Sequence, residues 1–222
     1  RVNWSEDGET LYAQRQNRDQ TVLDILAADP ATGASQTILT ETAQTWINLT
    51  GDLTPLDGGG FLWLSERTGF RHVYRVSETG ETTQLTAGRW VIDEISGVSA
   101  DGETVYFEGW VDDPLQRHLY SVPMADGTPV RVTSGQGRWS AGLGQGGTAF
   151  IGTYSDPSTP PQTGLYTIEG ERIAWIEENA LNEDHPYHPH LASHLTPEFG
   201  SLTAADGETE LYWEMLRPDH CT

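Results

Sequence analysis

The sequence predicts an all-β fold: a partial β-propeller of about four blades, each a four-stranded antiparallel meander, with a short trailing hairpin. The main observation is a pattern that returns at intervals of roughly 45 residues. Each unit holds short strand-like runs separated by Gly-rich or Asp-Gly turns, and Asp-Gly between alternating apolar residues is a strong hairpin signal. The first of these runs in each unit begins at Leu11, Leu62, Val105 and Ala149. A second run follows in each unit, and in the last three units it begins at an anchor residue, His72, His118 or Gly164; these anchors lie 46 residues apart.

The strands of each unit can be placed from these runs. In the first unit we expect strands at 9–16, 21–29 and 35–41, so that this unit lacks its opening strand. The second unit has four expected strands, at 46–50, 61–67, 72–77 and 82–86. The third has them at 91–98, 104–110, 117–124 and 129–133, and the fourth at 139–143, 148–155, 163–169 and 172–177.

After the fourth unit the period breaks. Residues 180–197 are rich in Pro and His, which is typical of a linker. A new hairpin around Asp206-Gly207 follows. We therefore divide the chain into a partial propeller (1–179, the first blade incomplete), a linker (180–197) and the truncated start of another domain (198–222).

Composition narrows the function classes. The chain of 222 residues has 33 acidic residues and 12 basic residues, and its formal net charge is −21. Every basic residue is Arg. Such a surface repels phosphate backbones, so we expect no nucleic-acid partner. No run approaches the ~18 apolar residues of a transmembrane helix, so we expect no membrane span. Cys221 is the only cysteine, which excludes an internal disulfide.

Aromatic residues recur at matching positions of the units, which favours packing between neighbouring blades. The tryptophans Trp46, Trp90 and Trp139 each open a first strand and are expected in the same core. The other members of the set are Tyr12, Trp63, Tyr106, Phe150, Tyr74, Tyr120 and Tyr166.

Three motifs that resemble active-site signatures are better explained by the fold. Gly97-Val98-Ser99 precedes a strand, whereas a nucleophile elbow joins a strand to a helix. The Gly-x-Gly-x-x-Gly spacing at 142–147 also lacks the helix of a dinucleotide site. Four histidines crowd into 185–194, but the prolines between them disfavour a helix that would align zinc ligands. We expect no catalytic residue, no metal site and no cofactor in this chain.

The innermost strand of each blade lines the channel of a propeller, and alternate residues point into it. In the second unit this strand is expected at 46–50, followed directly by residues 51 and 52. Asn48, Thr50 and Asp52 are therefore the candidate substrate-channel residues.

Segment 64–74, LSERTGFRHVY, resembles the SER-x-G-aromatic-x-H-aliphatic-Tyr strand pair of the dipeptidyl peptidase IV propeller. TVLDI at 21–25 and LTE at 39–41 before Trp46 are similar to the preceding blade of that family. The passage from HPY (185–187) through His194, PEF (197–199), ADG (205–207) and MLRP (215–218) resembles the family's entry into its peptidase domain. The resemblance covers nearly the whole chain in order.

The resemblance implies a bacterial prolyl oligopeptidase-like serine peptidase, in which an eight-bladed propeller caps an α/β-hydrolase domain. Such enzymes remove X-Pro or X-Ala dipeptides from peptide N-termini with a Ser, Asp and His of the hydrolase domain. A Glu pair in an earlier blade anchors the free amine. This sequence contains neither set, so no catalytic residue is carried over. The implied partners are the peptidase domain of the same polypeptide and peptide substrates, and the implied location is periplasmic or cell-surface.

Two other functions remain open. A stand-alone propeller-like module that binds proteins or peptides would end cleanly after a closing strand, and a tandem-repeat surface protein would continue the 45-residue units beyond both ends. A half-propeller also leaves sheet edges and apolar blade faces uncovered, so we expect the chain to associate with itself.

Overall fold

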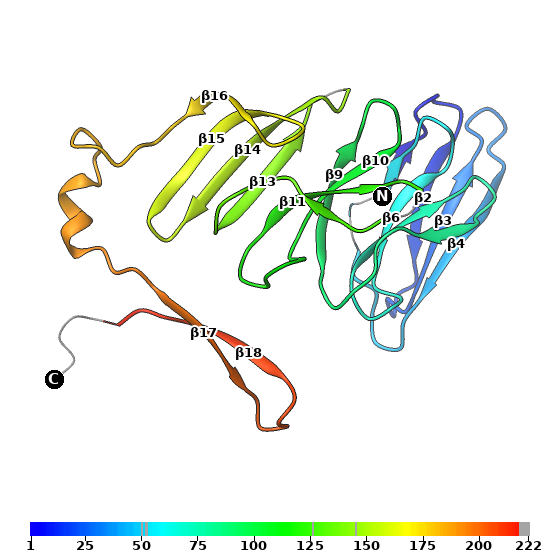
Figure 1. The fold of residues 1–222 in the computed structure, drawn as a ribbon. Helices are drawn as coiled ribbons and strands as arrows, with labels where there is room; N and C mark the ends of the chain where they lie inside the picture. Colours follow the sequence, from blue (N-terminus) through cyan, green and yellow to red (C-terminus); the bar gives the residue numbers. More distant parts are fainter. Residues whose placement is uncertain (50, 52, 126, 145, 218–222) are drawn as a thin grey trace.

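The computed structural model describes residues 1–49, 51, 53–125, 127–144 and 146–217. Its strands form four sheets in a row, followed by a separate hairpin (Figure 1). The elements are β1 (Val2–Trp4), β2 (Leu11–Gln16), β3 (Val22–Ala28), β4 (Ser35–Thr42), β5 (Leu53–Pro55), β6 (Phe61–Ser65), β7 (His72–Val76), β8 (Thr82–Gln84), β9 (Ile92–Val98), β10 (Thr104–Gly109), β11 (His118–Pro123), β12 (Val130–Arg131), β13 (Arg138–Leu143), β14 (Ala149–Asp156), β15 (Thr159–Thr167), β16 (Arg172–Glu177), the 3-10 helix η1 (His188–Ser193), β17 (Glu198–Thr203) and β18 (Glu210–Met215).

Each of the four sheets is an antiparallel meander of four consecutive strands, which confirms the predicted all-β blades. We call these sheets blades 1 to 4. The expectation that blade 1 lacks its opening strand was wrong, because Val2–Trp4 pairs with Leu11–Ala13 and completes the sheet. The sequence gives little signal for this strand, because it is only three residues long and precedes the first recognisable turn.

The packing between blades follows from the alternation of side chains along a strand. On β6, Phe61 and Trp63 face a cluster shared with blade 1, whereas Leu62 and Leu64 face a cluster shared with blade 3. Both faces of β6 are therefore apolar and buried, as expected for a strand between two other blades. On β10, Phe107 faces the same blade 2–3 cluster as Leu62.

A third cluster joins blade 3 to blade 4 through Tyr106, Trp139, Phe150 and Tyr166. The predicted inter-blade role of the recurring aromatics is confirmed for six of the seven positions outside the first strands, because these six residues belong to clusters shared by two blades. The seventh, Tyr74, is buried but belongs to none of these clusters. Trp139 and Trp90 also pack against these clusters.

Trp46 does not follow the pattern. It is 61% exposed, and no strand includes it. The expected strand at 46–50 was wrong for its described residues, because the first strand of blade 2 is the later segment Leu53–Pro55. Segment 43–49 is a loop instead, anchored to blade 1 by the Ile47 amide, which donates to the Gln20 carbonyl at 2.7 Å.

Turns of one kind close the first hairpins of blades 1 and 3. Ser99 Oγ donates to Asp101 Oδ1 at 2.5 Å and accepts from the Thr104 amide at 2.9 Å, while Gly102 adopts φ +74°. Ser5, Asp7 and Gly8 repeat this arrangement 94 positions earlier in the sequence. The Ser99 segment is thus a hairpin turn between β9 and β10, as the sequence indicated.

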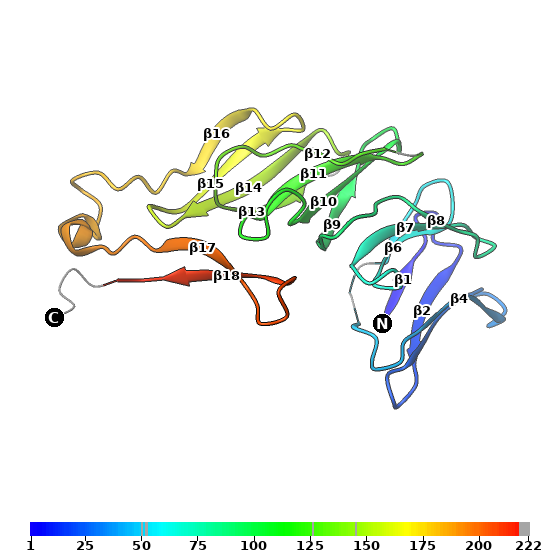
Figure 2. The same cartoon turned by 60° about the horizontal axis from the view of Figure 1, so that its bottom comes forward.

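Beyond β16 the chain leaves the blades. Residues 179–197 contain η1, and the hairpin β17–β18 then runs back alongside blades 3 and 4 without joining any blade sheet (Figures 1 and 2). Among the described residues no helix is long and apolar enough to cross a membrane.

Candidate functional site

Several loops project from the same end of each blade. They are segments 43–49, 66–71 and 110–117 and the turn at 157–158, and we call the surface that they form the loop rim. The hairpin β17–β18 lies on this side: Phe199 and Tyr212 of the hairpin line a shallow surface pocket of about 360 Å³ together with Asp112, Asp113 and Leu115 of the loop rim. The loop rim is therefore the face that the chain meets as it leaves the propeller.

A cavity of about 240 Å³ opens on the loop rim between blades 1 and 2. Asn48 lines it and accepts a hydrogen bond from Trp46 Nε1 at 3.1 Å. The Asn48 amide also donates to both carboxylate oxygens of Glu66, at 3.2 and 3.0 Å. Asn48 thus lies on a loop rather than on an innermost strand, and its role in a substrate channel stays a prediction. Thr50 and Asp52 lie outside the described residues.

The floor of this cavity holds a buried carboxylate. Glu41, at the end of β4, is 7% exposed and accepts a hydrogen bond from Trp63 Nε1 at 3.0 Å. It also forms an ion pair with Arg67, whose Nε donates to Ser65 Oγ at 3.0 Å. The Arg67 guanidinium lies 4.7 Å from the ring centroid of Tyr74. These contacts satisfy the buried charge and fix a cation beside the cavity.

A second charged cluster joins blade 3 to its neighbours. On β9, Asp93 is an extra residue between the pairs Ile92–Gly109 and Glu94–Glu108, so β9 bulges there. The carboxylate of Asp93 pairs with Arg117 at 2.8 Å. From blade 2, Arg71 donates to the Ile92 carbonyl at 2.6 Å. Arg71 and Arg117 therefore both bind β9, the first strand of blade 3.

Glu108, on β10, connects blade 3 to blade 4. It is fully buried, forms an ion pair with Arg117, and accepts a hydrogen bond from the Ala141 amide of β13 at 2.5 Å. Burial, with a smaller contribution from the nearby carboxylate of Glu94, raises the pKa of Glu108 to about 7, although the hydrogen bond from the Ala141 amide and the charge of Arg117 oppose the shift. A buried carboxyl with such a pKa can exchange a proton near neutral pH.

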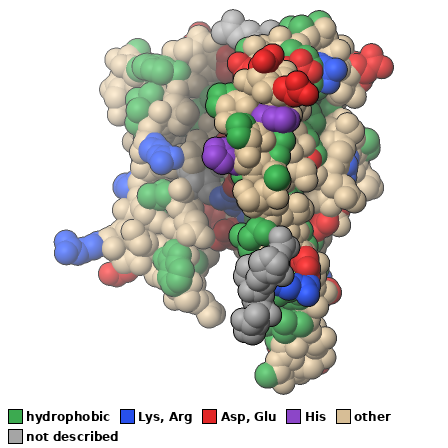
Figure 3. All heavy atoms as spheres, turned by 90° about the vertical axis from the view of Figure 1, so that its left-hand side faces the viewer, with side chains coloured by type: hydrophobic (Ala, Val, Ile, Leu, Met, Phe, Trp, Pro, Cys, Tyr) green, Lys and Arg blue, Asp and Glu red, His purple; other side chains and the backbone are tan. Residues whose placement is uncertain are grey.

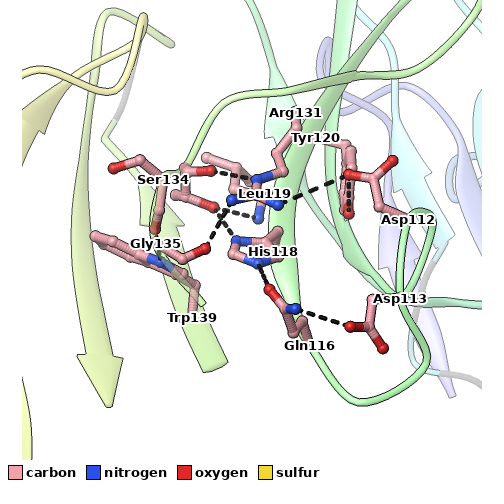
Figure 4. Close-up of polar contacts among 11 residues, drawn as sticks. Asp112, Asp113, Gln116, His118, Leu119, Tyr120, Arg131, Ser134, Gly135 and Trp139 are labelled. Carbon is pink, nitrogen blue, oxygen red and sulfur yellow. Dashed lines mark hydrogen bonds and ion pairs between the residues drawn. The ribbon is translucent and has the colours of Figure 1, made fainter. Parts of the chain in front are cut away.

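A polar network supports loop 110–117 from within blade 3 (Figure 4). His118 is fully buried; its Nε2 donates to Gln116 Oε1 at 3.3 Å, and the Gln116 amide donates to Asp113 at 2.8 Å. The Thr133 hydroxyl accepts from the Leu119 amide at 3.1 Å and donates to His118 Nδ1 at 3.0 Å. Both ring nitrogens of the neutral imidazole therefore have partners.

The same arrangement occurs in blade 2. His72 Nε2 donates to the Gly88 carbonyl at 3.0 Å, and the Thr86 hydroxyl donates to His72 Nδ1 at 3.2 Å while accepting from the Val73 amide. Burial lowers the pKa of His72, and it lowers the pKa of His118 to about 4. Sequence reasoning marked both histidines as repeat anchors but missed this shared histidine–threonine pair, whose signal is a Thr 14 or 15 residues after each histidine.

Figure 3 shows the side of the molecule on which η1 lies in Figure 1, and on this side imidazoles adjoin hydrophobic side chains. A cavity of about 340 Å³ separates segment 185–194 from the β14–β15 turn. In the part of the chain that the structure describes, no three His, Cys, Asp or Glu side chains gather as they would around a metal ion.

Comparisons with known proteins agree on one family. Residues 1–161 match the family described as the dipeptidyl peptidase IV (DPP IV) N-terminal region. The "Probable dipeptidyl-aminopeptidase B" of Emericella nidulans is 28% identical over 200 residues, which cover 80% of this chain and 22% of that protein. The "Probable dipeptidyl peptidase 4" of the same organism is 32% identical over 108 residues, which cover 47% of this chain and 14% of that protein.

The crystal structure of Porphyromonas gingivalis dipeptidyl peptidase 4 superimposes with a TM-score of 0.86 and 23% identity. The match covers 98% of this chain and 31% of that protein, and it supports the propeller architecture. The chain thus spans less than a third of the length of these relatives. From the match to residues 1–161, the chain belongs to the dipeptidyl peptidase IV family and contains part of its N-terminal region.

Proposed function

We propose that this chain is a non-catalytic propeller part of a dipeptidyl peptidase IV-like serine exopeptidase, which removes X-Pro or X-Ala dipeptides from peptide N-termini. In this proposal the serine, aspartate and histidine that cleave the peptide belong to another part of the polypeptide. The propeller part limits which peptides reach them and provides the surface on which the peptidase domain docks.

The observation that carries this proposal is the position of the chain after β16. Residues 181–194 lie against the β14–β15 turn, and the hairpin β17–β18 lies against loop 110–117. Both contacts involve the loop rim. A domain that continues from β18 begins beside this surface, which makes the loop rim the natural docking face.

The cavity between blades 1 and 2 supports the selective role. It opens on the same rim, and its polar groups are held in fixed positions by the contacts of Glu41, Arg67 and Asn48. Preorganised groups beside a chamber can select among entering chains, because they need no rearrangement when a peptide arrives. The Asn48 side chain lines the cavity beside Glu66, where a larger side chain would narrow it.

The test is the variant Asn48→Trp in the complete polypeptide. We expect kcat/KM for a ten-residue X-Pro peptide to fall about tenfold, equivalent to ~1.4 kcal/mol, with kcat/KM for a chromogenic dipeptidyl substrate unchanged. The matched control is Thr83→Trp, an exposed position on the outermost strand of blade 2. Equal losses for both substrates, or no loss for either, would contradict the selective role.

A further inference from the structure

Three turns of the chain share the sequence Asp-Gly-Glu-Thr, at 7–10, 101–104 and 206–209. They close the first hairpins of blades 1 and 3 and the hairpin β17–β18. A fourth Asp-Gly pair, Asp57-Gly58, lies in the first hairpin turn of blade 2. At Asp-Gly pairs the backbone nitrogen of glycine can attack the preceding side-chain carboxyl group, because glycine has no side chain to obstruct the approach.

The attacking nitrogen is engaged in all three Asp-Gly-Glu-Thr turns. The amide of each glycine donates to the carbonyl three residues earlier, at 2.9 Å for Gly8 and Gly102 and at 3.0 Å for Gly207. This bond has to break before the nitrogen can turn toward the aspartate side chain. The turn therefore protects its own Asp-Gly bond.

The carboxylates of these three turns are engaged as well. Asp7 Oδ1 accepts the Ser5 hydroxyl at 2.6 Å and the Glu9 amide at 3.0 Å. Asp101 makes the same two bonds with the residues at matching positions. Asp206 accepts two backbone amides at 2.9 Å and one hydroxyl at 2.6 Å. Each carboxyl group is thus held away from the nitrogen that would attack it.

The same bonds keep the three carboxyl groups ionised. The hydrogen bond from a nearby Ser or Thr hydroxyl is the main cause that lowers the pKa of Asp7 and Asp101, and it lowers the pKa of Asp206 to about 2. An ionised carboxylate is the less reactive form, because ring closure has to expel one of its oxygens as water.

The turn at Asp57 is shorter and lacks both restraints. The Leu56 amide donates to the Gly60 carbonyl at 3.2 Å, so three residues form the loop instead of the four of the other turns. The bond across the turn is made by the Gly59 amide, which donates to the Leu56 carbonyl at 3.0 Å. Among the residues that the structure describes, neither the Gly58 amide nor the Asp57 carboxylate has a hydrogen-bond partner.

Exposure does not account for this difference. All four aspartates are exposed, and a side chain added at any of the four glycines that follow them would meet no atom within 4 Å. Water and space for ring closure are therefore available at every turn, and the hydrogen bonds are what distinguishes Asp57.

We propose that Asp57 is a site of spontaneous covalent modification, at which the Gly58 nitrogen attacks the side-chain carboxyl carbon and aspartate becomes isoaspartate. As the new C–N bond forms, one carboxyl oxygen leaves as water with the amide hydrogen and the carboxyl proton, and a five-membered succinimide results. Water then adds to the backbone carbonyl and breaks its bond to the Gly58 nitrogen. The chain is left linked through the side-chain carbonyl. Water is the only other reactant, and the step is independent of the proposed function.

Isoaspartate adds one methylene group to the main chain of this turn. Strand β5 has only three residues, and its pairing with β6 begins beside the turn, at Pro55 and Phe61. Leu53 of the same strand is 3% exposed and belongs to the core between blades 1 and 2. We expect the modified turn to lose the Leu56–Gly60 bond and to loosen blade 2 at the end opposite the loop rim.

The test is prolonged incubation of the 222-residue chain at pH 7.5 and 37 °C, followed by digestion with trypsin. Cleavage after arginine places the four Asp-Gly pairs in four different peptides, in which electron-transfer fragmentation measures isoaspartate. We expect it to form about thirtyfold faster at Asp57 than at Asp7, Asp101 or Asp206, the factor for two hydrogen bonds that need not be broken. A yield at Asp57 no higher than at the other three positions overturns the proposal.

Two controls separate the fold from the local sequence. In the urea-unfolded chain the four pairs lose these hydrogen bonds and should react at similar rates. An undiminished excess at Asp57 in urea would assign the effect to neighbouring residues and overturn the proposal.

The second control is Gly58→Ala, in which a methyl group shields the attacking nitrogen. Gly58 is not one of the glycines at positive φ, so the turn should keep its conformation, with tryptophan fluorescence unchanged. Isoaspartate at Asp57 should then fall to the level of the other three turns. An unchanged yield in this variant would contradict attack by the Gly58 nitrogen.

Discussion

The buried imidazole of His118 gives the sharpest prediction of stability. In His118→Ala the Thr133 hydroxyl and the Gln116 amide oxygen each lose a partner, and the ring leaves a void beside Tyr120. One net hydrogen bond contributes about 1 kcal/mol, and removing a buried aromatic ring costs several. We expect the free energy of unfolding at pH 7.5 to fall by about 3 kcal/mol.

The loss of unfolding free energy caused by His118→Ala should be smaller at acidic pH. Burial, with the charge of Arg131, lowers the pKa of His118 from 6.5 to about 4 in the folded state, although Asp112 and Asp113 oppose the shift. The folded protein thus binds the proton less readily than the unfolded chain, so the neutral ring stabilises fully above pH 6.5 and loses this contribution as pH falls toward 4. Between pH 7.5 and 5.0 the linkage relation gives a decrease of at most about 2 kcal/mol.

The assay is urea unfolding of both proteins at the two pH values, followed by tryptophan fluorescence. His190→Ala, an exposed histidine, controls for the removal of a titrating group as such. The difference between wild type and His118→Ala should fall from about 3 to about 1 kcal/mol on acidification. A difference that stays constant or grows would refute the assignment of a neutral, buried His118.

Two further predictions concern Glu108 and the blade faces. Because burial raises the pKa of Glu108 to about 7, its ionisation destabilises the fold as pH rises through 4.5 to 7. As pH rises from 5 to 8, the free energy of unfolding of Glu108→Gln, measured in urea titrations, should therefore increase relative to that of the wild type. A relative decrease over this range would contradict the raised pKa. The outer faces of blades 1 and 4 expose Trp4 at 53% and Ile176 at 59%. Light scattering should show a dimer of the 222-residue chain that dissociates in the double variant Trp4→Ser/Ile176→Ser, whereas a monomer at all concentrations would contradict self-association.

The sequence predicted the blades because their causes are local. Strand β6 is apolar on both faces, and Gly residues at positive φ, such as Gly102 at +74°, mark the turns between strands. Trp63 and Tyr120 each belong to a set of aromatic positions that recurs at about the blade period, and each fills space between two sheets. These features depend on residues within one unit and its neighbour.

The misplaced elements depend on more distant contacts. Trp46 is an apolar residue of the kind that opens the first strand of other blades. The next residue, Ile47, is instead held in a loop by its hydrogen bond to the Gln20 carbonyl of the previous blade. The pairing of Glu41 with Arg67, 26 residues later, likewise has no local signal. The path of segment 179–194 could not be predicted because it depends on hydrogen bonds to the carbonyl groups of Pro157 and Pro161, on the neighbouring hairpin.

The most direct test of the central proposal is to assay the complete polypeptide for release of N-terminal dipeptides. The substrate is a peptide beginning Ala-Pro with a free amine, and the control is the same peptide with an acetylated N-terminus. The account predicts release of Ala-Pro from the first peptide only, with loss of activity after treatment with a serine-directed phosphonate. Failure to cleave either peptide, with correct folding, would contradict it and favour a propeller that serves as a binding module.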